Sequence, residues 1–86
     1  MRLVVTDRFR RAYQSLSVRD RERVQEAPRR MQAGLRHPGL RVRRVRETRA
    51  VWEALAKHSL RITFEVEPDA LVLRLVGQHD EALGNP

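Results

Sequence analysis

The clearest structural pattern of the chain lies in Leu60–Leu83, LRITFEVEPDALVLRLVGQHDEAL. Its first eight residues alternate apolar and polar side chains, a period of two that is typical of a half-buried strand. The apolar side of this strand consists of Leu60, Ile62, Phe64 and Val66. Pro68 and Asp69 are turn-forming residues. The run Ala70–Val76 is apolar apart from Arg74, which predicts a second strand that is covered on both faces and central in its sheet.

The two strands are so close in sequence that only a hairpin can join them. If Glu67 pairs with Ala70, the register places Arg61 opposite Val76, at the end of the hairpin away from the turn. The residues that leave the sheet at that end include His79. An arginine and a histidine at one strand end form a candidate site.

Length and composition limit the possibilities. With 86 residues, of which 41% are hydrophobic, we expect a single domain, residues 1–86, with one modest core. The sequence has no run of 18 apolar residues and no cysteine, which argues against a membrane span, a disulfide framework and a cysteine nucleophile. Leu3–Val5 is too short for the apolar region of a signal peptide. We therefore expect a cytoplasmic protein.

The net charge of +7 is more informative. Among 18 basic residues, Lys57 is the only lysine. Arginine grips phosphate with a planar fork and stacks on bases. Arginine-rich codon usage explains the scarcity of lysine, but it does not explain the excess of positive charge. A polyanionic partner, either nucleic acid or an acidic protein, is the better interpretation.

The N-terminal part predicts a strand followed by two helices. Arg2–Thr6 is a short apolar run of strand type, and Thr6 or Asp7 can cap the helix after it. The inner stripe of that helix consists of Phe9, Ala12, Tyr13 and Leu16. Ser17, with Asp20 three residues later, resembles a capping box and begins a second helix.

The inner stripe of the second helix consists of Val24, Ala27, Met31 and Leu35. Pro28 has no backbone N–H to donate, which destabilises a helix interior by roughly 3 kcal/mol. We therefore expect a kink or break near Glu26–Ala27. Gly34 suits the C-terminal cap. A tight join between the two helices predicts an antiparallel helical hairpin that covers one face of the sheet.

A basic segment, Leu40–Arg49, follows a predicted turn at His37–Gly39. It contains one glutamate and five arginines, which are Arg41, Arg43, Arg44, Arg46 and Arg49. The segment predicts an edge strand with Leu40, Val42 and Val45 pointing inward. Its charge either protects a sheet edge against pairing with other chains or grips phosphates. Five arginines exceed what edge protection needs, which favours the phosphate-binding interpretation.

The segment Ala50–Lys57, AVWEALAK, is ambiguous. Its composition favours a helix, but its position between the basic segment and the hairpin favours a strand. We predict a strand with Trp52 on one side and Glu53 on the other. The expected fold is therefore α+β: a mostly antiparallel four-stranded sheet with an N-terminal helical hairpin packed on one face.

The sequence lacks a glycine-rich phosphate loop, HExxH, GxSxG and any cluster of metal-ligand residues, so we expect neither a metal nor a cofactor. RNA supplies its own nucleophile, the 2′-hydroxyl. Cleavage through a 2′,3′-cyclic phosphate needs an acid/base, which a histidine can supply near neutral pH, and positive charge on the phosphorane. His79 with Arg61 fits these roles, with Arg74 or an arginine of Leu40–Arg49 as a second clamp. Glu53 is either a general acid/base or a surface charge.

Three motifs in order resemble those of the RelE/ParE superfamily of bacterial toxins. The first is LRVRRVRE at Leu40–Glu47 followed by Trp52-Glu53-Ala54, which is similar to the basic ridge and aromatic motif of that family. The second is Ser59–Phe64, which resembles its YRLVY-type strand. The third is Val76–Asp80, which resembles the closing G-x-H tail of YoeB-like and YafQ-like members. The resemblance extends over essentially the whole chain.

This resemblance implies the fold described above and an activity. By it, Arg61 stabilises the scissile phosphate and His79 is the acid/base, while Leu40–Arg49 holds mRNA or ribosomal RNA. The implied function is a translation-inhibiting mRNA endoribonuclease that acts in the ribosomal 30S A site. The implied partner is an acidic antitoxin, through which alone the protein contacts operator DNA. RelE itself has a tyrosine near its C-terminus, whereas the only tyrosine here is Tyr13.

Two other functions remain open. The ParE branch shares the fold but inhibits DNA gyrase and cleaves no RNA; its tail usually lacks a histidine, so His79 favours the ribonuclease. A non-toxic nucleic-acid-binding regulator is the second alternative. No segment resembles a recognition helix presented to a major groove.

Overall fold

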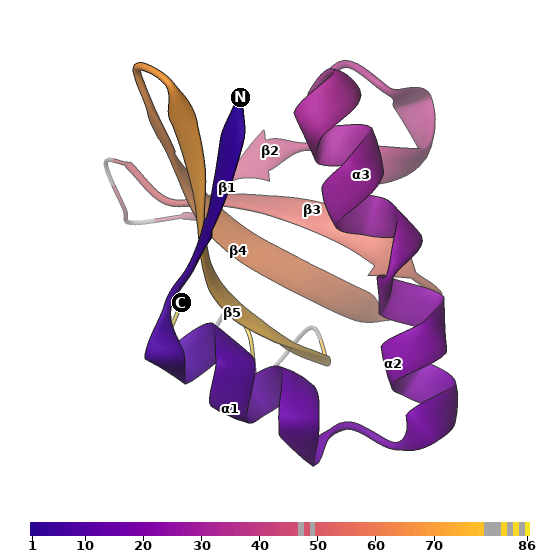
Figure 1. Ribbon diagram of the computed structural model, residues 1–86. Coiled ribbons are helices and arrows are strands. Elements are labelled where there is room, and N and C mark those ends of the chain that lie inside the picture. The colour runs from indigo at the N-terminus through magenta and orange to yellow at the C-terminus, as the bar shows by residue number, and fades with distance from the viewer. Residues whose placement is uncertain (47, 49, 79–81, 83, 85) are drawn as a thin grey trace.

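The computed structural model describes residues 1–46, 48, 50–78, 82, 84 and 86. Within them a five-stranded sheet carries the helices on one face (Figure 1). The strands are β1 (Arg2–Val5), β2 (Arg43–Arg44), β3 (Trp52–Lys57), β4 (Leu60–Glu67) and β5 (Ala70–Gln78). The helices are α1 (Asp7–Ser15), α2 (Val18–Val24), α3 (Glu26–Ala33) and the short 3₁₀ helix η1 (Pro38–Leu40). None of the described helices is long and apolar enough to cross a membrane.

The strand order is β1-β5-β4-β3-β2. The pairs β2–β3, β3–β4 and β4–β5 are antiparallel, as predicted, whereas β1 lies parallel to β5. The α+β class is confirmed, but the prediction of four strands is wrong. The sheet has five strands, and it is mixed because β1 pairs with β5 in parallel.

The hairpin of β4 and β5 begins in the predicted register and then shifts by one residue. Glu67 pairs with Ala70 as expected, and the shift falls between Thr63 and Phe64. Arg74 is the additional residue in β5, as in a β-bulge. Arg61 therefore pairs with Gly77 rather than Val76, and it still lies at the end of the hairpin away from the turn.

Both predicted helix caps form. The Thr6 hydroxyl accepts a hydrogen bond from the backbone N–H of Phe9, and the Ser17 hydroxyl accepts one from that of Asp20. The helical run then breaks at Gln25, one residue before the predicted Glu26–Ala27. Proline has no N–H, so residue 28 cannot donate to the carbonyl of residue 24, where α2 ends.

The predicted antiparallel hairpin of helices is wrong. In Figure 1, α1 runs along the bottom of the molecule, whereas α2 and α3 rise along its right-hand side. On the sheet, α1 mainly contacts β5, α2 contacts β3, and α3 contacts both β3 and β1. The cause is the join: Leu16 and Ser17 both have extended backbones, which lead the chain away from α1 toward β3 on the same face of the sheet.

The core lies between the helices and one face of the sheet. Buried side chains of the helices, Phe9, Val24, Ala27 and Met31, meet Leu60, Ile62 and Phe64 of β4 and Leu71, Leu73 and Val76 of β5. Val66 belongs to the same alternation but is exposed, because the tip of the hairpin projects beyond the helices (Figure 1). The predicted inner stripes of the helices are thus confirmed.

The middle of the chain forms β2 and β3, the two strands at one edge of the sheet. Residues 52–57 are a strand, as predicted, and Trp52, Ala54 and Ala56 pack against the core. The predicted edge strand is reduced to Arg43–Arg44. Arg41 has a left-handed backbone with φ of 46°, which ends η1 and redirects the chain before β2.

Candidate active site

Three charged side chains meet on the sheet face opposite the helices. In β3, Glu53 alternates with the core-facing Trp52 and Ala54, so it points away from the helices. The sheet register pairs Arg43 of β2 with Glu53, and Glu53 with Thr63 of β4. Arg61 lies two residues from Thr63 and hence on the same face. Three neighbouring strands therefore bring Arg43, Glu53 and Arg61 together, and we call these residues the Arg–Glu–Arg cluster.

Glu53 is the centre of this cluster. The Nε atom of Arg43 donates a hydrogen bond to Oε1 of Glu53. The Nε atom of Arg61 lies 3.9 Å from the same oxygen, which is an ion pair but too long for a hydrogen bond. The Glu53 side chain is only 2% exposed, compared with 21% for Arg61 and 63% for Arg43. The interpretation of Glu53 as a surface charge is wrong, whereas its role as a general acid/base stays a prediction.

Two polar atoms of the cluster have no hydrogen-bond partner among the described residues. They are Oε2 of Glu53 and Nη1 of Arg61, and both are buried. A buried carboxylate needs compensation from nearby positive charge, and here two arginines provide it. The cluster as a whole carries one excess positive charge, so it is suited to an anion.

A second ion pair occupies the neighbouring part of the same face. Nη1 of Arg74 lies 3.0 Å from Oε1 of Glu65, and its Nε donates to the carbonyl oxygen of Pro86 at 3.1 Å. The hydroxyl of Thr63 donates to the same carbonyl at 3.2 Å. The bulge in β5 thus places Arg74 in contacts within the protein. Its predicted role in RNA binding stays a prediction.

The arginines of the basic segment do not form one continuous row. All four that the structure describes, Arg41, Arg43, Arg44 and Arg46, are exposed. Arg43 lies opposite Glu53 and its neighbour Arg44 opposite Trp52, so the two point to different faces of the sheet. Arg49 lies outside the described residues. Phosphate binding by these arginines stays a prediction.

The histidine and aspartate at the end of the hairpin, His79 and Asp80, also lie outside the described residues. The hairpin itself brings Arg61 opposite Gly77 and Leu60 opposite Gln78, so Arg61 does lie near the point where the chain leaves β5. The proposed partnership of Arg61 and His79 stays a prediction.

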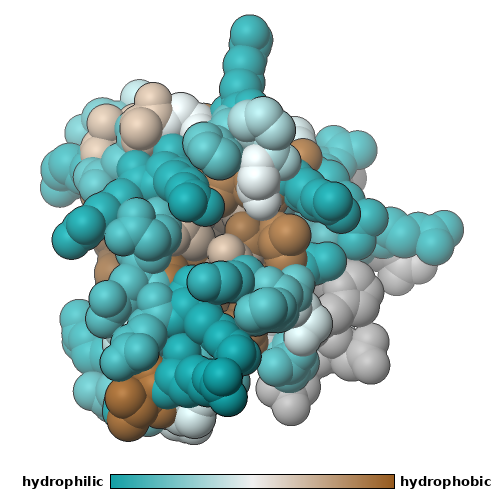
Figure 2. Space-filling model, turned by 90° about the vertical axis from the view of Figure 1, so that its right-hand side faces the viewer, coloured by the Kyte–Doolittle hydropathy of each residue, from teal (hydrophilic) through white to brown (hydrophobic). Residues whose placement is uncertain are grey.

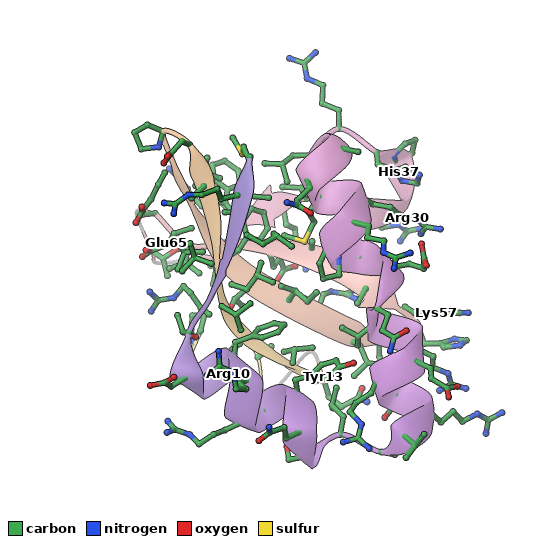
Figure 3. All side chains as sticks on the ribbon, in the orientation of Figure 1. Arg10, Tyr13, Arg30, His37, Lys57 and Glu65 are labelled. Carbon is green, nitrogen blue, oxygen red and sulfur yellow. The ribbon has the colours of Figure 1, made fainter. Side chains whose placement is uncertain are left out.

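The sequence did not reveal two features. One is the pairing of Arg43 with Glu53, which would follow from the register of the edge strand once its two paired residues are known. The other is a shallow pocket of about 270 Å³ lined by Arg30, Ala33, Gly34 and His37. Figure 3 shows Arg30 and His37 near one another beside α3. Nδ1 of His37 accepts a hydrogen bond from the backbone N–H of Gly39 at 3.0 Å.

The side of the molecule that carries α2 and α3 is mainly hydrophilic (Figure 2). Arginines on the outward positions of these helices, Arg19, Arg29 and Arg30 among them, are exposed. In the described part of the chain, no group of three His, Asp or Glu side chains could hold a metal ion.

Comparison with known proteins shows the fold. No protein-family profile matches the chain, and no curated protein matches it by sequence. Among solved structures, a copper-bound mutant toxin from Helicobacter pylori superposes with a TM-score of 0.78 at 18% identity, over 94% of this chain and 97% of the other. A chain of the RelB–RelE antitoxin–toxin complex from Methanococcus jannaschii superposes with a TM-score of 0.73 at 15% identity. The match covers 91% of this chain and 92% of the other.

A chain of the RelBE2 toxin–antitoxin complex from Mycobacterium tuberculosis gives 0.62 at 18% identity, over 91% of this chain and 96% of the other. These proteins share the α+β architecture along nearly their whole lengths. The protein therefore has the fold of RelE-type toxins, as the resemblance of its motifs predicted.

Proposed function

We propose that this protein is the toxin of a bacterial toxin–antitoxin module and that it is an endoribonuclease that cleaves mRNA on the ribosome. The observation that carries the proposal is the Arg–Glu–Arg cluster at the end of the β4–β5 hairpin, in a fold shared with RelE-type toxins. The cluster has one excess positive charge, and the sequence places a histidine just after the strand that pairs with Arg61.

The chemistry assigns one role to each side chain. His79 either takes the proton from the 2′-hydroxyl or donates one to the leaving 5′ oxygen, and water makes the other proton transfer. Arg61 stabilises the negative charge of the phosphorane. Exposed arginines of the basic segment, Arg41, Arg44 and Arg46, hold the flanking phosphates, because each guanidinium can donate two parallel hydrogen bonds. RNA supplies the nucleophile, so no covalent enzyme intermediate is needed.

The proposed partner is an acidic antitoxin. A net charge of +7 on 86 residues favours an acidic protein that covers the same arginines that would bind RNA. Two of the similar structures are of toxin–antitoxin complexes, which supports a partner of this kind. We expect the toxin to act in the cytoplasm and to contact operator DNA only through that complex.

Induced expression in a bacterium without the antitoxin tests the proposal. We expect growth arrest, a rapid fall in amino-acid incorporation and unaltered DNA supercoiling. Loss of a general acid/base costs roughly 10²–10⁴ in rate, so His79→Ala should restore growth and protein synthesis while the variant accumulates in folded form.

The matched control is His58→Asn, which changes an exposed histidine in the turn between β3 and β4. Asparagine is chosen because His58 has a left-handed backbone with φ of 56°, which asparagine tolerates. This variant should arrest growth like the wild type. Full toxicity of His79→Ala would refute the role of that histidine, and arrest with a DNA-damage response but continued translation would identify the gyrase-inhibiting alternative.

A further inference from the structure

The Arg–Glu–Arg cluster holds two positive charges close together through one carboxylate. Arg43 and Arg61 come from strands on opposite sides of β3, and both approach Oε1 of Glu53 through their Nε atoms. Like charges repel at such distances, so the two guanidinium groups need the carboxylate between them to stay on a common face.

The mode of approach leaves part of each guanidinium free for another ligand. Guanidinium has five N–H donors in a planar fork. Contact with Glu53 through Nε does not use the edge formed by the two terminal nitrogens. Arg43 is well exposed and Arg61 is partly exposed. Nη1 of Arg61 is buried and makes no hydrogen bond with a described residue.

We infer that Glu53 is a positioning residue, which holds Arg43 and Arg61 so that both guanidinium groups bind one phosphate of single-stranded RNA. The identity of the ligand rests on the proposed function. Glu53 itself does not touch the RNA, since its side chain is buried. The general acid/base role considered from the sequence is then unnecessary.

The direction in which Glu53→Gln changes RNA affinity distinguishes positioning of the two arginines from a simple effect of net charge. Glu53→Gln removes a negative charge from a basic surface, so electrostatics alone would tighten the binding of an anion. Positioning predicts the opposite, because the neutral amide no longer holds two arginines. We expect the dissociation constant of a short 2′-O-methyl RNA oligonucleotide, which cannot be cleaved, to rise roughly tenfold or more, equivalent to one charge-assisted hydrogen bond.

The matched control is Glu65→Gln. Glu65 also lies in an ion pair with an arginine, Arg74, on the same sheet face, and Figure 3 shows it on the hairpin. Its replacement removes the same charge, but Arg74 keeps its contact with the carbonyl of Pro86. Binding by Glu65→Gln should be as tight as that of the wild type or tighter. Weakening of the same size in both variants would overturn the inference.

The salt dependence of binding gives a readout that a merely structural role would not move. For single strands, the slope of log K against log salt changes by about 0.7 for each phosphate contact. Folded Glu53→Gln protein, with folding checked by thermal unfolding, should show a slope shallower by about that amount. Binding as tight as that of the wild type with an unchanged slope would refute positioning by Glu53.

If Glu53→Gln does not fold, a second pair of variants tests whether Arg43 binds the phosphate. Arg43 is 63% exposed and Arg10, on α1, is 60% exposed, and each forms an ion pair with an acidic residue. Arg43→Gln should weaken oligonucleotide binding roughly tenfold, and Arg10→Gln much less. Equal losses would mean that only net charge matters and would overturn the inference.

The test does not depend on cleavage. One outcome is that the wild type binds the oligonucleotide, with weaker binding by Glu53→Gln and Arg43→Gln, and yet cleaves no mRNA in cells. In that case the proposed function fails, and the phosphate site formed by Arg43 and Arg61, the phosphate clamp, stands. If mRNA is cleaved but Glu53→Gln binds like the wild type, the proposed function stands and the clamp fails. Absence of oligonucleotide binding by the wild type would overturn the clamp as well.

Discussion

At the scale of single residues, Thr6 makes more contacts than a helix cap requires. Its hydroxyl accepts the N–H of Phe9 at 3.0 Å. It also lies 3.0 Å from the carbonyl oxygen of Leu73 and 3.2 Å from that of Arg74, both in β5. Thr6 thus joins the start of α1 to the bulge in the central hairpin. Ser17 makes the corresponding bond to Asp20, but the structure gives its hydroxyl no bond to the sheet.

This difference predicts unequal losses of stability. Ser17→Ala should lower the free energy of unfolding by roughly 1 kcal/mol, which is typical of a lost N-cap. Thr6→Ala should cost roughly 2 kcal/mol, because a partly buried bond to a β5 carbonyl is lost together with the cap. Urea unfolding monitored by circular dichroism measures both. Equal losses would show that the contacts of Thr6 with β5 contribute nothing.

Residue chemistry also explains which details could be predicted. Both caps followed from side-chain oxygens placed just before apolar stripes. The register at Glu67–Ala70 followed from the turn, but the pairing of Arg61 did not, because alternation along one strand does not reveal an additional residue in its partner. Burial of Glu53 was not predictable either, since it depends on its pairing with β2, where Arg43 lies 10 residues earlier in the chain, and with β4.

At the scale of elements, the break between α2 and α3 lets one helical run cover a curved sheet. Val24, Ala27 and Met31 all reach the core, although α2 ends at Val24 and α3 begins at Glu26. Pro28 lies in the first turn of α3, where N–H groups have no partner inside the helix. In this position proline costs little.

Replacement of this proline tests the interpretation. Pro28→Ala should be neutral or destabilise the protein by about 0.5 kcal/mol, because it only increases the freedom of the unfolded chain. Proline in the middle of α3, as in Arg30→Pro, should cost about 3 kcal/mol. Chemical unfolding compares the two variants with the wild type. A gain of about 3 kcal/mol from Pro28→Ala would mean that α2 and α3 are one strained helix.

Helices and strands with a long hydrophobic pattern were predicted correctly. The prediction failed where tertiary contacts determine the length or orientation of an element. β4, β5 and the inner stripes of the helices followed from periodicity. The strand at residues 52–57 followed from its position, against its helical composition. The length of β2 and the crossing of α1 with α2 did not follow, because pairing with β3 and the extended join at Leu16–Ser17 set them.

At the scale of the whole molecule, the sheet separates the Arg–Glu–Arg cluster from the apolar core. The helices and the apolar core occupy one face, and the Arg–Glu–Arg cluster and the Arg74–Glu65 pair occupy the other. Family motifs predicted the overall fold, which the similar toxin structures share. The candidate site was predicted in part: Arg61 and Glu53 lie together, Arg43 joins them, and His79 lies outside the described residues.

The proposed ribonuclease activity is best tested by a map of mRNA 5′ ends after induced expression without the antitoxin. Wild type, His79→Ala and Arg61→Gln are compared with the His58→Asn control. We predict new ends in register with codons in translated regions, present in wild type and control and absent from the other two. Intact transcripts during growth arrest by the wild type would contradict the account.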